Sequence, residues 1–572
     1  MGVNSLGSPG NFHVKNKTNE LVTASFLCLP KRTAFTVWVT SAATLFVFHL
    51  LFALTCCETT IWTGEHWAHS MPATRNPIAT ENRKRGSSDW ALTNPALNRE
   101  VEGYMSHTSV QRGESILLFH NSKSPMVELE VFRTGWYQGL GARRLFGPVQ
   151  VAGVEQVVPS PDNYGMVQCQ WKDPFILHTN NTWTTGVYLV RLTESSTFAQ
   201  SYTIFVLRDD SHIADITFQL PTNTYQAYNF WGGRSLYGWG SGSQLPWGTR
   251  GGTKARKVSY DRPYARSNNE RAAHGNGAGE YLTNIQPLFP NYGLNSSASW
   301  NYNMVRWLER EEVDVTYITN VDTHDRMRDL PRPKLFLTQG HDEYWSNEMR
   351  DNVEGLRDNG THLAFLGSNT AYFMVRMEEG EGNPNIIDPV LVPKLARNES
   401  RVITCYKQGR KDPIKDKRSV PAREYRPEAD MVGVEYVGDP YEEDMVIKNA
   451  SHWMFNGTGV LDGHVLPGLL GYEVDSMRDS KTKNNNIITP IFETPLKNIH
   501  IMRSDPILLC HGTIYTAESG AHVLGSGTMQ WSWALDDYGV MEGLRSSRLN
   551  NVIERVTWNF FEAAGIMRTH SY

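Results

Sequence analysis

The sequence predicts an α/β fold with a mostly parallel sheet, preceded by an all-β immunoglobulin-like sandwich and an N-terminal transmembrane helix. Short apolar runs with period-2 alternation fill residues 98–210, and strands alternate with amphipathic helices after residue 210. Residues 33–57 are an uncharged apolar stretch long enough to cross a bilayer. The length of 572 residues is sufficient for about three domains.

The N-terminal segment is interpreted as a cytoplasmic tail, residues 1–32, followed by a transmembrane signal anchor, residues 33–57. The anchor, "TAFTVWVTSAATLFVFHLLFALTCC", contains no charged residue. Lys31 and Arg32 precede it and acidic residues follow it, which indicates that the N-terminal side is cytoplasmic. A cleaved signal peptide is the alternative, and the long segment before the apolar run argues against it. We therefore expect a single-pass type II membrane protein that contacts the membrane through this helix.

Potential glycosylation sites downstream of the predicted anchor agree with that topology. Asn-x-Ser/Thr sequons can be modified only in the secretory lumen, so they place the C-terminal region in the lumen or outside the cell, as an N-glycosylated protein. These sequons are at Asn180, Asn295, Asn359, Asn398, Asn449 and Asn456. Three cysteines lie well beyond the anchor, Cys169, Cys405 and Cys510, so at most one disulfide can form among them.

Residues 58–97 are polar and lack a periodic pattern, which is typical of a stalk or linker. Residues 98–210 contain strand-like runs such as "VELEVFRTGWY", in which Val127, Leu129 and Val131 alternate with glutamates. This alternation indicates half-buried strands. An immunoglobulin-like β-sandwich fits a series of such strands over about 110 residues.

Residues 211–572 are predicted to form the α/β domain, of the kind found in flavodoxin and glutamine amidotransferases. "DITFQL" predicts a strand at 215–220 and "WNYNMVRWLEREE" predicts a helix. "PKLFLTQ" and "HLAFLGSN" predict two strands around a helix at 346–358, with Ser346 as its N-cap. Strands that alternate with helices favour parallel pairing through right-handed crossovers.

Polar side chains follow three of these predicted strands at the point where each strand ends. In parallel sheets, ligands bind in the crevice beyond the carboxyl ends of the strands. We therefore expect one crevice to be lined by the following side chains: Asn223, Tyr228, His341, Glu343 and Asn369. A turn-capping role competes for each of them and is favoured for Asn223.

Composition and motifs restrict the chemistry of this crevice. A net charge of -5 with 20% charged residues gives no basic surface for a nucleic-acid backbone, so no nucleic-acid partner is expected. The sequence has no Gly-x-Ser-x-Gly nucleophile motif and no phosphate-binding loop, and His341 and Glu343 are not spaced as zinc ligands on a helix. Carboxylate and tyrosine oxygens remain, and these hard donors together suit ferric iron.

Eight motifs in order carry a resemblance to a known family. They are "NTYQAYNFWGG", "SYDRPY", "WLEREEVDVTYITNVD", "GHDEYWSNEMRD", "GSNTAY", "HWMFNGTG", "GYEVD" and "QWSWALDD". Over about residues 100–565 the sequence resembles the C-terminal domain of the large (beta) subunit of N,N-dimethylformamidase. The resemblance implies a mononuclear Fe(III) held by two tyrosines and a glutamate, which acts as a Lewis acid in the hydrolysis of an amide or formamide C–N bond in a small substrate.

The resemblance also assigns the metal ligands, motif by motif. Glu343 of "GHDEYW" matches the glutamate ligand, and Tyr228 of "YQAYN" and Tyr264 of "SYDRPY" match the two phenolates. Tyr225 and Tyr260 are alternatives beside them.

Catalytic roles follow from the same motifs. His341 resembles a supporting or acid/base group, and Asn369 an orienting amide. Glu473 of "GYEVD" resembles the carboxylate that accepts a proton from the attacking water. A surface acid and a turn-capping imidazole are the competing interpretations of Glu473 and His341.

The predicted anchor departs from this family, and residues 1–95 do not resemble its separate small subunit, so N,N-dimethylformamide itself is not the expected substrate. The alternative function is a non-catalytic cell-surface protein that binds a glycan or peptide. Trp231, Trp239 and Trp247, in a Gly-rich segment, would stack on such a ligand, although anchoring of the loop in the core is the favoured interpretation of these residues. Homo-oligomerisation stays open.

Overall fold

The structure is a computed structural model. It describes residues 11–15, 21–25, 76–238, 252–267, 269–285, 298–385, 396, 398–415, 419–496, 500–501, 509–541 and 544–568. The chain divides into two compact units, Met1–Ala73 and Thr74–Tyr572. The first contains a hairpin in which β1 (Asn11–Lys15) pairs antiparallel with β2 (Leu21–Ser25). The second contains all the remaining described residues.

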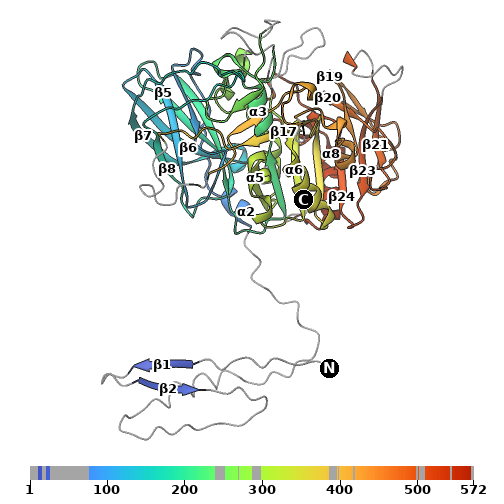
Figure 1. The fold of residues 1–572 in the computed structure, drawn as a ribbon. Helices are drawn as coiled ribbons and strands as arrows, with labels where there is room; N and C mark the ends of the chain where they lie inside the picture. Colours follow the sequence, from blue (N-terminus) through green and yellow to red (C-terminus); the bar gives the residue numbers. More distant parts are fainter. Residues whose placement is uncertain are drawn as a thin grey trace. The chain divides into compact units, whose positions relative to one another are not determined.

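Two sheets pack face to face in the first part of the second unit (blue to green in Figure 1). Their facing side chains form a common core, to which Val127, Leu129 and Val131 contribute as the sequence pattern predicts. The larger sheet has the order β4 (Ser109–Gln111), β10 (Gln200–Arg208), β9 (Gly186–Glu194), β6 (Met126–Thr134) and β7 (Ala142–Ala152). The smaller sheet has the order β3 (Val101–Met105), β5 (Ser115–Ser122) and β8 (Phe175–His178).

A seven-stranded mixed sheet forms the centre of the second unit. Its order is β13 (Val315–Thr319), β11 (Ile216–Leu220), β14 (Leu335–His341), β16 (His362–Ser368), β24 (His522–Gly525), β23 (Leu509–Thr516) and β21 (Thr489–Pro495). The first five strands pair parallel, and β23 and β21 join them antiparallel. The parallel part brings the carboxyl ends of β11, β14 and β16 to one edge of the sheet.

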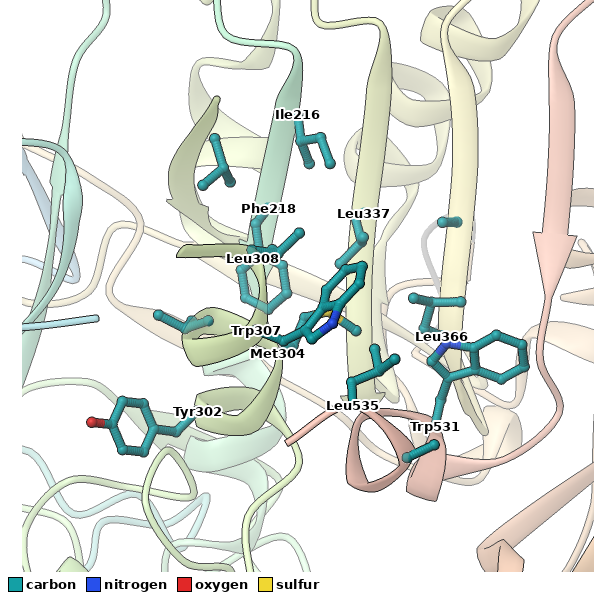
Figure 2. Close-up of a cluster of buried hydrophobic side chains, with 14 of the residues drawn as sticks. Ile216, Phe218, Tyr302, Met304, Trp307, Leu308, Leu337, Leu366, Trp531 and Leu535 are labelled. Atoms are coloured by element: carbon teal, nitrogen blue, oxygen red, sulfur yellow. The ribbon is translucent and has the colours of Figure 1, made fainter. Parts of the chain in front are cut away.

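Helix α4 (Asn301–Arg310) covers one face of this sheet. Its apolar side, with Met304, Trp307 and Leu308, packs over Phe218 of β11 and Leu337 of β14 (Figure 2). The other described helices are α2 (Pro77–Asn82), α3 (Thr222–Tyr228), α5 (Asn320–Asp325), α6 (Asn347–Asp358), α7 (Ala429–Val432) and α8 (Asn551–Ala563). For α6 the predicted bounds are confirmed, and its N-cap is Ser346, whose hydroxyl accepts a hydrogen bond from the Met349 N–H.

Two smaller sheets flank the centre. One has the order β12 (Lys257–Ser259), β18 (Val402–Thr404), β17 (Phe373–Glu378) and β15 (Tyr344–Ser346). The other has the order β20 (Val465–Ser476), β19 (Glu435–Val446) and β22 (His500–Ile501). Strands β15 and β20 position residues of the candidate site.

The predicted α/β class is wrong: the protein consists of mixed sheets with few helices. Between Val432 and Asn551, the described residues contain strands and 3-10 turns but no α-helix. The prediction extended the alternation of strand and helix seen at 300–368 over the whole C-terminal part, whereas β20 there pairs antiparallel with β19, and β23 pairs antiparallel with both β21 and β24. Apolar runs of strand length do not reveal by themselves whether a helix separates them.

The predicted single-pass membrane protein is contradicted as well. In the part of the chain that the structure describes, no helix has the length and apolarity needed to span a bilayer. The range 33–57, on which the prediction rests, lies outside the described residues.

Residues 76–97, the described part of the predicted linker 58–97, pack within the second unit. The Asn82 side chain of α2 donates to Glu309 of α4 at 2.8 Å, and Glu81 is fully buried against Arg143 of β7. Glu309 also forms a fully buried ion pair with Arg133 of β6 at 2.6 Å, which joins the two-sheet region to the helix. No disulfide joins the described cysteines, because Cys169, Cys405 and Cys510 are buried free thiols.

Candidate active site

The three consecutive polar residues at the end of β14, His341 to Glu343, do not all face the same side of the chain. In extended chain, residues two apart share a face, so His341 and Glu343 lie on one side and Asp342 on the other. Asp342 accepts hydrogen bonds from Gln219, Asn320 and Thr338, which occupy its carboxylate within the core. His341 and Glu343 are therefore the pair that faces the candidate site.

The main chain of Glu343 is fixed by two neighbouring elements. Its N–H donates to the Thr224 hydroxyl of α3 at 2.9 Å, and its carbonyl accepts from the Phe373 N–H of β17 at 2.9 Å. Asn223, also in α3, donates to the Tyr344 carbonyl at 2.8 Å and so holds the turn rather than facing the site. The main chain that carries the Glu343 side chain is thus held on both sides.

Two phenol groups meet the Glu343 carboxylate. The Tyr228 hydroxyl, at the end of α3, donates to Oε2 at 3.0 Å. The Tyr237 hydroxyl lies 3.0 Å from both carboxylate oxygens and 2.9 Å from the Tyr228 hydroxyl. Oxygen atoms from three chain segments therefore converge on one point.

A third phenol and a cation border this group. The Tyr344 hydroxyl lies 2.5 Å from the Tyr237 hydroxyl and accepts a hydrogen bond from Lys407 Nζ at 2.7 Å. Lys407 Nζ also lies 3.2 Å from the centre of the Tyr237 ring, a close cation–π contact. Lys407 therefore places a positive charge against the phenol pair.

His341 connects Glu343 to a second carboxylate. Its Nε2 lies 3.3 Å from Glu343 Oε2 and 3.2 Å from Glu473 Oε2, and all three residues are buried. Glu473 comes from β20, so this contact joins the β20 sheet to the end of β14. The imidazole thus bridges two carboxylates.

Asn369, just beyond the end of β16, completes the arrangement. Its Nδ2 lies 3.3 Å from His341 Nε2, and its Oδ1 is buried without a hydrogen-bond partner. The Oε2 of Glu473 is also buried, and although it lies near His341 it makes no well-aligned hydrogen bond. Buried polar atoms are nearly always paired, so the unpaired Asn369 Oδ1 beside His341 indicates a place for a ligand or water.

Burial and neighbouring charges set the protonation states. Burial by itself favours the neutral forms, but Glu473 and Glu343 raise the pKa of His341 well above its ordinary value. Burial also opposes ionisation of Glu343, yet hydrogen bonding and charge from His341 lower its pKa overall. Burial raises the pKa of Glu473 to about 7, against the opposing charge of His341. Burial lowers the pKa of Lys407 to about 8.

The two phenols are neutral in this state, because burial and then the charge of Glu343 raise the pKa values of Tyr228 and Tyr237 well above 10. A bound cation would reverse that balance, since a positive ion favours phenolate. Within the described residues, no group of three or more His, Cys, Asp or Glu side chains could hold a metal ion. A metal at this site would therefore depend on the phenol oxygens.

The structure brings together five of the six residues predicted for the site, namely Tyr228, His341, Glu343, Asn369 and Glu473. Tyr264 is not among the side chains described in contact with Glu343. It packs edge-to-face on Tyr225 at 6.4 Å and hydrogen-bonds Gln226.

The two alternative tyrosines are also engaged elsewhere. The Tyr225 hydroxyl donates to Asn301 at 2.8 Å, and the Tyr260 hydroxyl donates to Asn223 at 2.6 Å. Neither is described in contact with Glu343, so the structure offers Tyr237 as the second phenol.

Sequence reasoning missed Tyr237, Tyr344 and Lys407. Tyr237 stands in "SLYGWG", where the neighbouring tryptophans and glycines suggested a ligand-stacking loop. Tyr344 directly follows Glu343, and no pattern in the sequence distinguishes it from the rest of the turn. Lys407 has no local signal, because it follows β18, which the pairing with β17 brings to the site.

Trp231 serves the core rather than an exposed surface. It is 5% exposed, and its indole N–H donates to Glu102 at 2.7 Å. Trp239 and Trp247 lie outside the described residues. Trp231 also lines a pocket together with Arg99 and Phe230, so the binding alternative stays a prediction.

Comparison with known proteins identifies the family that the motifs predicted. A family model described as N,N-dimethylformamidase beta subunit-like, C-terminal, matches residues 128–545. This range includes all the residues of the candidate site. No curated protein matches the chain.

Proposed function

The chain belongs to the N,N-dimethylformamidase beta subunit-like family, and we propose that it hydrolyses the C–N bond of a small amide. The observation that carries the proposal is the contact of His341 with Glu473 and Glu343, beside two phenols and the unpaired buried Oδ1 of Asn369. Such a set can activate water and protonate a leaving amine, which are the two proton transfers that amide hydrolysis requires.

The residues present fit the mononuclear ferric iron that the family implies. Glu343, Tyr228 and Tyr237 supply a carboxylate and two phenol oxygens within 3.0 Å of one another, and these donors match the preference of Fe(III) for hard oxygen ligands. These three residues would hold the ion, with Tyr264 as the alternative second phenolate. When bound, the ion supplies Lewis acidity toward a carbonyl or water oxygen.

Glu473 is the proposed general base. Its pKa of about 7 means that much of it is ionised at neutral pH while it still binds a proton strongly enough to accept one from water. The proton leaves the water as the water oxygen forms its bond to the amide carbon. Because Glu473 Oε2 is buried and makes no well-aligned hydrogen bond, it is available for that water.

His341 is the proposed proton donor to the leaving group, and Asn369 is the proposed orienting group for the substrate. His341 is protonated between its two carboxylates and can donate a proton to the departing nitrogen as the C–N bond breaks, after which Glu473 returns the proton that it took. We assign to Asn369 the role of orienting the substrate through its side-chain amide, and the buried, unpaired Oδ1 supports this role. The products are a carboxylic acid and an amine, in equal amounts.

The test is turnover by the purified protein supplied with ferric iron. Formamides and primary, secondary and tertiary amides are incubated with the protein, and the acid and the amine are quantified separately. We expect equal release of both products from at least one class. Binding of iron without any product release from the whole panel would contradict the proposal.

A further inference from the structure

Asp475 is a buried carboxylate directly beside the proposed base. It lies two residues after Glu473 in β20, so the two side chains leave the strand on the same face. It is 2% exposed. Its Oδ1 accepts a hydrogen bond from the Ser368 hydroxyl at 2.6 Å and another from the Asn369 backbone N–H at 2.9 Å.

Asn369, whose backbone N–H donates to Asp475, has an unusual backbone conformation. Asn369 has a φ of 56°, in the left-handed region that few residues other than glycine adopt. Asparagine tolerates this region better than most residues, but still at some cost in energy. The hydrogen bond from the Asn369 N–H to Asp475 holds the backbone there and thereby fixes the direction in which the Asn369 side chain starts.

That direction brings one end of the Asn369 amide to His341 and leaves the other end for a ligand. Nδ2 lies 3.3 Å from His341 Nε2, and Oδ1 is buried without a partner. A half-turn of the amide would exchange the two ends, and one of them would still be unpaired. An unpaired buried amide end is unfavourable, and a substrate bound at this point would relieve that cost.

We infer that Asp475 is a positioning residue, which acts through Ser368 and Asn369 to aim the Asn369 amide at the substrate. The inference rests on the proposed amide hydrolysis at the same site. Burial raises the pKa of Asp475 to about 6, so the carboxylate is ionised at neutral pH and accepts both hydrogen bonds as a charged group. Hydrogen bonds to a charged acceptor are stronger than those to a neutral one.

Loss of any buried carboxylate that accepts backbone hydrogen bonds can destabilise the protein. Glu194 provides the control for this general effect. Glu194 of β9 is also buried and also accepts backbone hydrogen bonds, from Ser196 at 2.7 Å and Thr197 at 2.6 Å, but it lies in the two-sheet region. Glu194→Ala therefore removes the same kind of contact without touching the candidate site.

The first experiment is a double-mutant cycle on amide hydrolysis. Asp475→Ala should lower kcat/KM by about 10- to 100-fold, as misplacement of an orienting group does. Asp475→Asn keeps an acceptor oxygen and should stay within about fivefold of wild type. In an Asn369→Ala background, Asp475→Ala should lower kcat/KM by less than about twofold more, because the residue through which it acts is already gone. If the fold-decrease in kcat/KM of the double variant equals the product of the decreases in the two single variants, the inference is overturned.

The second experiment needs no turnover. Hydrogen exchange of the segment 366–371 is measured by mass spectrometry in wild type, Asp475→Ala and Glu194→Ala. Faster exchange in Asp475→Ala alone is expected, because the Asn369 N–H loses its acceptor. If no amide is hydrolysed, the proposed function fails, and the exchange measurement still decides whether Asp475 holds the Asn369 backbone. Unchanged exchange in Asp475→Ala would overturn the inference.

Discussion

Replacement of Tyr237 by phenylalanine tests whether this residue, rather than Tyr264, is the second phenol of the site. The substitution removes one oxygen and leaves the ring in place. That oxygen lies within 3.0 Å of both Glu343 oxygens, 2.9 Å from Tyr228 and 2.5 Å from Tyr344. The variant therefore deprives a buried carboxylate of a donor and leaves it with Tyr228 and His341.

The magnitude follows from the charge of the acceptor. A hydrogen bond to a charged group contributes about 1.5–3 kcal/mol, so the free energy of unfolding of iron-free Tyr237→Phe should fall by about that amount. Tyr264→Phe is the matched control, because it removes the same atom from a bond to the neutral Gln226 side chain. The free energy of unfolding of Tyr264→Phe should fall by about 0.5–1.5 kcal/mol. Urea denaturation of both variants beside wild type measures the difference.

Titration with ferric iron gives the second readout. Tyrosinate bound to ferric iron absorbs visible light by charge transfer, so the loss of one of two phenolate ligands should shift and weaken the band. We expect this change in Tyr237→Phe and a spectrum like that of wild type in Tyr264→Phe. The reverse result, with the band altered only by Tyr264→Phe, would refute the reasoning from the geometry and return the second ligand to Tyr264.

Three further predictions concern charge and burial. The kcat/KM for amide hydrolysis should rise as the pH passes through about 7, because Glu473 must be ionised to act as a base; a rate that falls over this range would exclude that role. Glu428 is buried, and neither of its carboxylate oxygens is hydrogen-bonded. Burial raises the pKa of Glu428 from 4.5 to about 7. The contribution of the protonated carboxyl to stability is therefore fully present below pH 4.5 and is lost as the pH rises through 7. Glu428→Gln should therefore gain about 1–3 kcal/mol on wild type between pH 5 and pH 8 in urea denaturation, and an equal difference at both pH values would contradict this. Glu309→Gln should cost about 3–5 kcal/mol because Arg133 stays buried without its anion, while Glu309→Leu combined with Arg133→Met should cost less than Glu309→Gln alone. Urea denaturation of these variants measures both losses, and a double variant less stable than Glu309→Gln would contradict the argument.

Local patterns predicted the parts of the fold that depend on neighbouring residues. The alternation at Val127, Leu129 and Val131 predicted the face that the two-sheet region buries, and Ser346 predicted where α6 begins. The pairing of the C-terminal strands could not be read in the same way. An apolar run such as that of β23 has the same appearance whether its partners are parallel or antiparallel, and the packing that decides between them is distant in the sequence.

In the candidate site, too, some residues could be predicted from local patterns and others depend on tertiary contacts. His341, Glu343 and Asn369 could be predicted because each stands where a strand ends, and the topology of the sheet then brings strand ends together. Tyr237 and Lys407 could not, because they reach the site from loops whose course depends on tertiary contacts. The motif match chose Tyr264, which hydrogen-bonds Gln226 in the fold. Which tyrosine meets the carboxylate is decided by tertiary packing, which a motif match does not report, so Tyr264 as a metal ligand stays a prediction.

The most direct test of the proposed active site is to measure iron content and amide turnover on the same preparations of wild type and Glu473→Gln. Glutamine keeps the shape of the side chain but cannot accept a proton from water. We predict equal iron content in both proteins and a turnover that is lower in Glu473→Gln by about 100-fold or more, in line with the loss of a general base. Equal turnover in the two proteins would contradict the assignment of the base and, with it, the catalytic role of the His341–Glu473 pair.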